Sequence, residues 1–163
     1  MIFRTATRQD LPAVLALLAQ DENPDAAAAG TGDPTPEPVS EPISEPVSEA
    51  HERAFAAIEA DPRNEMLVLE EDGHLVGCLQ LTYIPGLGRG GRERALVEAV
   101  RIRADRRGGG LGARLMELAA DRARERGCGL MQLTSNKRRT AAHRFYERLG
   151  YARSHEGFKL PLR

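Results

Sequence analysis

The chain has 163 residues, 41% of them hydrophobic, and a formal net charge of −1 at pH 7. This length predicts one domain with a substantial core. No apolar run approaches the roughly 18 residues of a membrane span, and the N-terminal stretch MIFRTATRQD lacks the apolar core of a signal peptide, so we expect a soluble, cytoplasmic protein.

Acidic and basic residues are unevenly distributed along the chain. Residues 21–50 contain eight Asp or Glu and no Lys or Arg, which leaves 16 acidic against 23 basic residues elsewhere, a net charge of about +7. A basic body suits a ligand with several phosphates, and it also suits nucleic acid. No zinc-finger or RNA-binding motif is present and only 4% of residues are aromatic, so we expect no nucleic-acid or membrane partner.

The cysteines and histidines are isolated from one another. Cys78 and Cys128 belong to no CxxC motif, so structural burial is favoured over metal or redox work. No two of the four histidines have metal-ligand spacing. The sequence therefore predicts no metal site.

The N-terminal part predicts a strand over residues 2–6 and a helix that starts with a capping box of Thr7 and Asp10. Residues 21–48 hold six of the ten prolines and the repeat EPVS-EPIS-EPVS, which cannot bury a core. We expect a disordered low-complexity insertion between the first two helices, with a docking motif of Val39, Ile43 and Val47 as the alternative. The first helix is expected to bury Leu11, Val14, Leu15 and Leu18.

The remaining chain alternates between strand and helix patterns. The hydrophobic periods predict a helix over residues 49–61 and two strands, 65–71 and 74–84, around an Asp72-Gly73 hairpin turn. A loop over 84–92 precedes a strand over 93–104, a helix to residue 126, a strand over 129–135 and a helix over 139–149 that Gly150 ends. Tyr151 and residues 158–162 are expected to close the sheet.

The junction after the strand at 93–104 is rich in glycine. It reads Arg107-Gly108-Gly109-Gly110-Leu111-Gly112, and a helical pattern begins at once. Backbone N–H groups of such a loop, together with a helix N-terminus, hold phosphates well. The spacing fits neither the dinucleotide fingerprint nor a P-loop. The alternative is a turn with surplus glycine.

Three motifs in the second half resemble the GNAT superfamily of N-acetyltransferases. The glycine loop matches its R-x-x-G-x-G signature, and residues 102–105 look like its V-x-P-x strand end, with Ala104 where proline is commoner. Residues 133–162 look like its closing unit N-x(5)-A-x(3)-Y-x(3)-G-[FY]. Their sequence is similar to that of the aminoalkylphosphonate N-acetyltransferases. The closing unit is matched by Asn136, Ala142, Tyr146, Gly150 and Tyr151.

The resemblance implies an α/β (α+β) GNAT fold, in which helices flank a mixed, mostly antiparallel sheet that is splayed in the middle. The element order is β-α-α-β-β-β-α-β-α-β. It implies acetyl-CoA as co-substrate and transfer of the acetyl group to the primary amine of a small molecule, by direct attack in a ternary complex. A CoA-binding sensor without turnover and a protein N-terminal or lysine acetyltransferase are the alternatives. A homodimer is common among relatives.

The resemblance also implies the roles of individual residues. Glu98 is the expected base and Tyr146 the expected acid, although Glu98 fits an exposed strand position and Tyr146 a core position. Strict alternation puts Glu98 on the face of its neighbours Val100 and Ile102 unless a bulge intervenes. His143 and His155 are expected on the surface or in packing. The expected cofactor-binding residues are Val100, Ile102, Arg106, Arg107, Gly108, Gly109, Gly110, Leu111, Gly112, Asn136 and Arg139, with a solvated arginine the alternative for Arg106 and a helix N-cap for Asn136.

Overall fold

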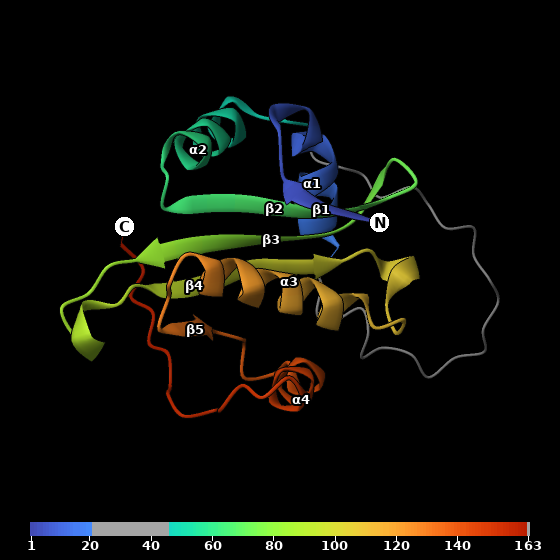
Figure 1. The fold of residues 1–163 in the computed structure, drawn as a ribbon. Helices are drawn as coiled ribbons and strands as arrows, with labels where there is room; N and C mark the ends of the chain where they lie inside the picture. Colours follow the sequence, from blue (N-terminus) through green and yellow to red (C-terminus); the bar gives the residue numbers. More distant parts are fainter. Residues whose placement is uncertain (21–45, 163) are drawn as a thin grey trace.

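A five-stranded sheet in the order β1-β2-β3-β4-β5 runs through the molecule (Figure 1). The computed structural model describes residues 1–20 and 46–162. All neighbouring strands are antiparallel except β4 and β5, which are parallel, so the predicted mixed, mostly antiparallel sheet is confirmed. The strands are β1 (Ile2–Thr5), β2 (Asn64–Glu71), β3 (His74–Ile84), β4 (Arg94–Ile102) and β5 (Leu130–Leu133), and the α-helices are α1 (Leu11–Ala19), α2 (Glu49–Ala60), α3 (Leu111–Glu125) and α4 (Thr140–Arg148).

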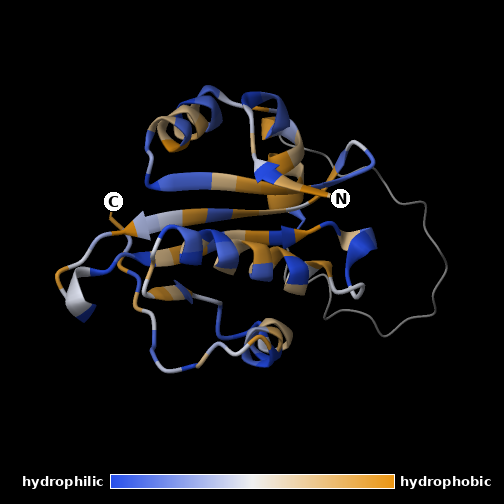
Figure 2. Cartoon of the chain, in the orientation of Figure 1, coloured by the Kyte–Doolittle hydropathy of each residue, from blue (hydrophilic) through white to orange (hydrophobic). Residues whose placement is uncertain are grey.

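Helices cover both faces of the sheet and enclose two hydrophobic cores. One core joins the sheet to α3, with α4 residues packed against it, and the other joins the opposite face to α1 and α2. The hydrophilic sides of the helices face outwards (Figure 2). No helix within residues 1–20 and 46–162 is both long and apolar enough to span a membrane.

The hairpin between β2 and β3 forms at the predicted turn. Asp72 and Gly73 have φ angles of 50° and 78°, the positive values that a two-residue type I′ turn requires. Residues directly opposite each other include Val68 with Cys78 and Leu67 with Leu79. Because side chains alternate along a strand, the first pair enters the α1/α2 core and the second the α3 core.

Helix α1 starts where the capping box predicts it, after one turn of 3-10 helix over Arg8–Asp10. The residues that it buries are Leu11, Val14 and Leu17. The predicted Leu15 and Leu18 are only half-buried at the edge of the same core. At 3.6 residues per turn, Leu15, Leu17 and Leu18 all lie within one broad apolar stripe. Contact with the sheet determines that Leu17 is the residue of the three that is buried.

The predicted closing strand is wrong for the described residues, since 151–162 contain no strand. The Ser154 N–H donates to the Ala152 carbonyl (3.1 Å), which bends the chain at the point where a ladder would begin. Pro161 has no N–H for a ladder. The apolar alternation of Phe158, Leu160 and Leu162 is real, but their side chains are 93%, 82% and 89% exposed.

Most of the predicted insertion, residues 21–45, lies outside the described residues. Its last residues belong to the fold. Val47 packs against the α1/α2 core, and the Ser48 hydroxyl accepts the His51 N–H (3.3 Å) as the N-cap of α2. Val47 and Ser48, at the end of the expected insertion, therefore contact the described fold.

Arg4 on β1 ties the start of the first helix to the sheet. Its guanidinium reaches Asp10 (2.7 Å) and Glu70 on β2 (2.7 Å), and Asp10 also accepts the Thr7 N–H (2.7 Å). The hydrogen bond from Arg4 lowers the pKa of Asp10 from 3.8 to about 2, against the opposing effect of burial. The native state therefore prefers the ionised carboxylate.

We expect Asp10→Asn to lower the free energy of unfolding by about 1–2 kcal/mol at pH 7. A carboxyl whose folded pKa is depressed stabilises the protein above its ordinary pKa, and this stabilisation is lost as pH falls from about 4 to about 2. Urea unfolding of the variant and the wild type at pH 7 and pH 3 measures the difference, which should shrink at the lower pH. A difference that stays constant would show that the carboxylate charge is not its source.

Candidate active site

The parallel strands β4 and β5 separate at a bulge in β4. Gln80 lies opposite Glu98 and Cys78 opposite Arg101, so two steps along β3 correspond to three along β4. The extra residue lies in the segment that holds Ala99, whose φ of 54° is unusual for a residue with a side chain. The ladder between β4 and β5 has already ended, because its last pair is Val97 with Leu133.

A hydrogen bond orients the peptide group in this bulge. The buried Cys78 thiol donates to the Ala99 carbonyl oxygen (3.7 Å). In a planar trans peptide the carbonyl and the following N–H point in opposite directions, so the Val100 N–H points away from that thiol. On the next peptide, the Val100 carbonyl accepts a hydrogen bond from Arg101 Nη1 (2.9 Å).

The bulge changes which face of the sheet the residues after it occupy, relative to Glu98 before it. Glu98 shares the face of its partner Gln80, on the α1/α2 side, and is exposed. Val100 and Ile102 pack against the α3 core instead. Strict alternation is therefore wrong here, and the alternative of an intervening bulge is correct.

The glycine loop joins β4 to α3 through one turn of 3-10 helix, Ala104–Arg106. Gly108 and Gly110 have φ angles of 82° and 80°, and no atom lies within 4 Å of the position that a Cβ would take at either residue. Gly110 is the N-cap of α3, so the free N–H groups of the first helical turn follow directly. The loop is open and its backbone is accessible, as an anion site requires.

The two arginines beside the loop already have protein partners. Arg106 forms an ion pair with Glu71 at the end of β2, and this contact raises the pKa of Arg106 and lowers that of Glu71. Arg107 Nε donates to the Ile102 carbonyl (3.0 Å). Arg106 is therefore partly exposed, and its charge is shared with a carboxylate.

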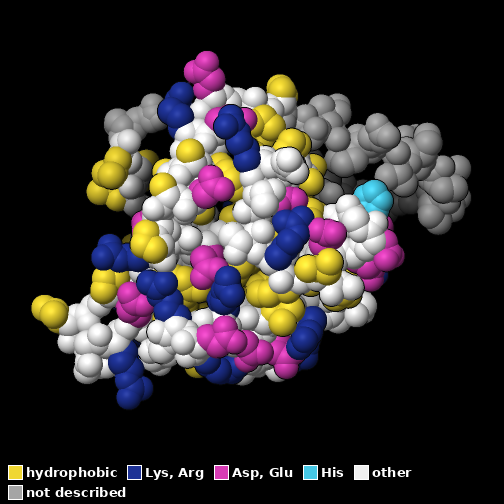
Figure 3. All heavy atoms as spheres, turned by 45° about the horizontal axis from the view of Figure 1, so that its top comes forward, with side chains coloured by type: hydrophobic (Ala, Val, Ile, Leu, Met, Phe, Trp, Pro, Cys, Tyr) yellow, Lys and Arg dark blue, Asp and Glu magenta, His cyan; other side chains and the backbone are white. Residues whose placement is uncertain are grey.

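Similar pairing moderates the basic character predicted for the body of the protein. Arg122 pairs with Glu65 and Arg126 with Glu93, each at 2.8 Å. Basic and acidic side chains are interspersed over the face shown in Figure 3. The surplus of positive charge therefore forms no continuous basic surface on that face.

Helix α4 packs against the beginning of α3. A Cβ added to Gly112 would lie 3.3 Å from Phe145 Cζ, so this glycine allows close approach of the two helices. Leu111 packs against the same core. The contact places the neighbouring Tyr146 in this region, with its ring 5.1 Å from Phe145 and 5.9 Å from Tyr151 in edge-on arrangements.

Asn136 and Arg139 lie in the turn before α4. Asn136 Oδ1 accepts the Arg138 N–H (2.9 Å), and its carbonyl accepts the Arg139 N–H (3.0 Å) and contacts His143 Nε2 (2.8 Å). The N-cap of α4 is Arg139, so the N-cap alternative for Asn136 is wrong. His143 and His155 are half-buried or exposed and make local contacts, with Ser154 Oγ 2.7 Å from His155 Nδ1.

Ser135 is a residue that the sequence analysis missed. Its Oγ is buried and has no hydrogen-bond partner in the structure. Ser135 follows the end of β5 by two residues, beyond the last β4–β5 pair of Val97 with Leu133. An unpaired buried hydroxyl costs about 1–3 kcal/mol, so a bound ligand or water is its natural partner. No sequence signal distinguishes this serine from a loop residue.

The two thiols are free. Cys78 is buried and Cys128 half-buried, and burial raises the pKa of Cys78 to about 12 and also raises that of Cys128. Burial thus confirms the structural interpretation for Cys78. A thiol with a raised pKa is a poor nucleophile near neutral pH.

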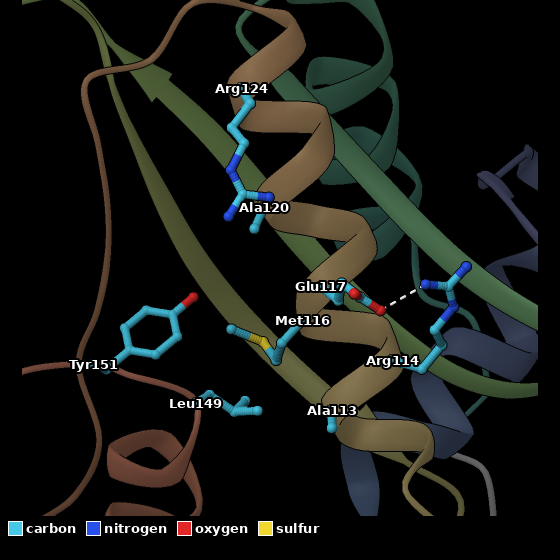
Figure 4. A pocket seen from close by; sticks show the side chains of 8 residues that line it. All are labelled: Ala113, Arg114, Met116, Glu117, Ala120, Arg124, Leu149 and Tyr151. Carbon is cyan, nitrogen blue, oxygen red and sulfur yellow. Dashed lines mark hydrogen bonds and ion pairs between the residues drawn. The ribbon is translucent and has the colours of Figure 1, made fainter.

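A separate cavity of about 470 Å³ lies between α3 and the end of α4 (Figure 4). Met116, Leu149 and Tyr151 give it an apolar lining, and burial raises the pKa of Tyr151 to about 12. Arg114 and Glu117, which pair at 2.6 Å, lie along its helical side. None of the predicted catalytic or cofactor-binding residues lines it.

Residues 33–151 match the model of the Acetyltransferase (GNAT) family. The chain belongs to the GNAT acetyltransferase family. The aminoalkylphosphonate N-acetyltransferase of Salmonella typhimurium is 33% identical over 113 residues, covering 69% of this chain and 73% of that protein. The streptothricin acetyltransferase of Streptomyces lavendulae is 33% identical over 94 residues, covering 58% of this acetyltransferase and 47% of that protein.

A solved structure also resembles this acetyltransferase over nearly its whole length. The crystal structure of a transcriptional regulator from Bacillus halodurans C-125 has a TM-score of 0.82 and 38% identity, and covers 99% of both chains. The family match and the N-acetyltransferase relatives identify the chain as an acyltransferase. The predicted superfamily and fold are confirmed.

We expect Gly110→Ala to lower the free energy of unfolding by about 1–2 kcal/mol, because a side chain is strained at a φ of 80°. Gly109→Ala is the matched control. Its φ is not positive and its Cβ would meet only the Arg106 carbonyl oxygen, at 3.9 Å, so we expect a change below about 0.5 kcal/mol. Denaturant unfolding measures both, and equal effects would contradict the αL requirement at Gly110.

Proposed function

We propose that this acetyltransferase moves the acetyl group of acetyl-CoA to the primary amine of a small molecule, by direct attack in a ternary complex. The observation that carries the proposal is the gap beside the β4 bulge. There β4 has lost its parallel neighbour, and the Val100 N–H is turned away from Cys78. This N–H would donate to the reacting carbonyl oxygen, a contact whose loss costs about 10²–10³ in rate.

The glycine loop supports a site for the pyrophosphate of the co-substrate. The open space at Gly108 and Gly110 and the free N–H groups at the start of α3 fit such an anion. The cofactor-binding roles of Arg106, Arg107, Gly109, Leu111 and Gly112 are part of this proposal. The ion pair with Glu71 leaves Arg106 a weaker contributor than the backbone.

The gap itself supports a site for the pantetheine arm. We assign the backbone of Val100 and Ile102 on β4 to one side of the arm. We assign Asn136 and Arg139 before α4 to the other side, where Ser135 would offer its buried hydroxyl, which has no partner. The thioester would end beside the bulge.

Glu98 and Tyr146 are the proposed base and acid. Glu98 directly precedes the bulge and is exposed, so it can take a proton from an amine directly or through water. Tyr146 packs on the α3 core with its ring beside Phe145 and Tyr151, and its hydroxyl is proposed to protonate the leaving thiolate. A covalent intermediate on Cys78 is disfavoured, because burial suppresses its thiolate.

The proposal also includes the binding partners and the cellular location of the protein. The acceptor is a small-molecule amine and not a nucleic acid or a membrane, and the cytoplasm supplies the acetyl-CoA. A homodimer is compatible with the exposed apolar residues of the C-terminal segment. The alternative of protein acetylation differs only in the acceptor.

A CoA-binding regulatory protein without turnover is the second candidate. It is favoured by one observation, the 38% identity to a structure described as a transcriptional regulator. Release of free thiol from acetyl-CoA, measured against aminophosphonates, aminoglycosides, polyamines, amino acids and peptides, separates the two. Turnover with at least one small amine is the expected result. Binding of CoA without any turnover would favour the regulator.

Glu98→Gln should lower kcat/KM at pH 7 by about tenfold or more and should recover activity as pH rises. An alkylamine with a pKa near 10 is neutral in only about one part in a thousand at pH 7, so the base matters most there. The measurement is a pH–rate profile from pH 6 to 10. Glu117→Gln on α3, an exposed carboxylate paired with Arg114, is the control. A profile that follows the wild type would place the base elsewhere.

Tyr146→Phe should lower kcat about tenfold or more while the Kd for CoA stays within a few-fold. The change removes a proton donor and keeps the ring with its packing. Tyr151→Phe, which alters the adjacent ring, is the matched control and should keep its kcat. Steady-state kinetics and calorimetry measure the two quantities. Full kcat in Tyr146→Phe would make this tyrosine a packing residue and solvent the proton source.

A further inference from the structure

Polar side chains form a strip across three strands on the α1/α2 face of the sheet. The polar strip consists of Asn64 on β2, Gln80 and Thr82 on β3, and Glu98 on β4. Thr82 lies directly opposite Asn64, and Gln80 lies directly opposite Glu98. Side chains at opposite positions project from the same face, so all four share one surface.

This polar strip is unlike the rest of its face. Further along the same strands, Val68 and Cys78 are completely buried in the core under α1 and α2. Asn64, Gln80 and Thr82 are only half-buried, and Glu98 is exposed. A sheet face that α1 and α2 covered throughout would carry apolar residues here, as it does at Val68 and Cys78.

Hydrogen bonds within the polar strip fix which groups remain for a ligand. Asn64 Nδ2 donates to Asp61 Oδ2 (2.9 Å), and Asn64 Oδ1 accepts from Thr82 Oγ1 (2.8 Å) and from Gln80 Nε2 (3.4 Å). The Thr82 hydroxyl proton is thereby used, while its oxygen can still accept. The surface consequently offers mainly acceptors: Thr82 Oγ1, Gln80 Oε1 and the Glu98 carboxylate.

The charges of the polar strip also restrict its ligand. Glu98 is its one ionisable group, and the residues facing Thr82 and Gln80 from the neighbouring strands include the apolar Leu96 and Met66. An anionic group placed beside Glu98 would be repelled by its carboxylate, and the two arginines of β4 on this face, Arg94 opposite Ile84 and Arg101 opposite Cys78, lie beyond the polar strip. An ammonium at Glu98 and uncharged donors further along match it.

We propose that the polar strip binds the acceptor, and that it selects an amine whose carbon frame carries hydroxyl groups, such as an amino sugar or an amino alcohol. The amine lies at Glu98, beside the β4 bulge, and a hydroxyl donates to Thr82 Oγ1. Thr82 is one strand across and two residues along from Glu98, a separation of about 8 Å, which suits a hexose with its substituents. This inference rests on the acetyl transfer proposed above.

The test compares glucosamine, propylamine and 2-aminoethylphosphonate as acceptors for the wild type and for Thr82→Val. The variant keeps the shape of the side chain and removes the accepting oxygen. For the wild type we expect kcat/KM for glucosamine to exceed those for the other two amines by about tenfold. Thr82→Val should lower kcat/KM for glucosamine about tenfold through KM, and leave propylamine unchanged.

Two further variants keep the test decisive. Thr5→Val on β1 makes the same chemical change at a threonine that is not part of the polar strip and should leave every acceptor unchanged. Gln80→Met removes a second acceptor at similar volume and replaces Thr82→Val if the latter loses its native melting temperature. An equal loss with glucosamine and propylamine, or a wild-type preference for 2-aminoethylphosphonate, would overturn the inference. Absence of turnover with these three amines and with the wider panel of amines named above would instead refute the proposed acetyl transfer itself.

Discussion

One extra residue in β4 is the constraint on which the site depends. Between Glu98 and Arg101 the strand must fit three steps against two on β3, and the chain absorbs the difference at Ala99 with a φ of 54°. Such a conformation costs about 1–2 kcal/mol for a residue with a side chain, so the surrounding structure must enforce it. The buried thiol of Cys78 contributes by donating to the Ala99 carbonyl. This gives a cysteine of low reactivity a structural task close to the proposed chemistry.

The bulge also divides β4 between two environments. Before it, Glu98 stands on the open polar face, and after it, Val100 and Ile102 return to the core under α3. The same strand can therefore hold a solvated carboxylate and a dry packing surface within five residues. Without the bulge, alternation from Glu98 would place Val100 and Ile102 on the polar face instead of in the core under α3.

The glycine loop and α4 complete the proposed active site on the α3 side of the sheet. The loop turns directly into α3, and Gly112 lets Phe145 approach the first helical turn. Helix α4 thereby holds Tyr146 on the side of the sheet where α3 lies. Tight helix packing and the proposed anion site thus depend on the same glycine-rich stretch, for two different reasons: close contact at Gly112 and left-handed backbone at Gly108 and Gly110.

The sequence by itself determined the family, through the glycine loop and the closing motif, and it determined most elements. Periodicity and turn chemistry are local, so the Asp72-Gly73 hairpin, the Thr7 capping box and the four α-helices could be predicted from neighbouring residues alone. Tertiary structure decided what depends on pairing between distant segments. The register of β4 against β3 sets the faces of Glu98 and of the residues after the bulge, Glu71 engages Arg106 from the end of β2, and the Ser135 hydroxyl is buried without a partner. Apolar alternation at 158–162 likewise predicted a strand, but a strand needs a hydrogen-bonded partner, and the bend at Ala152–Ser154 leads this segment away from one.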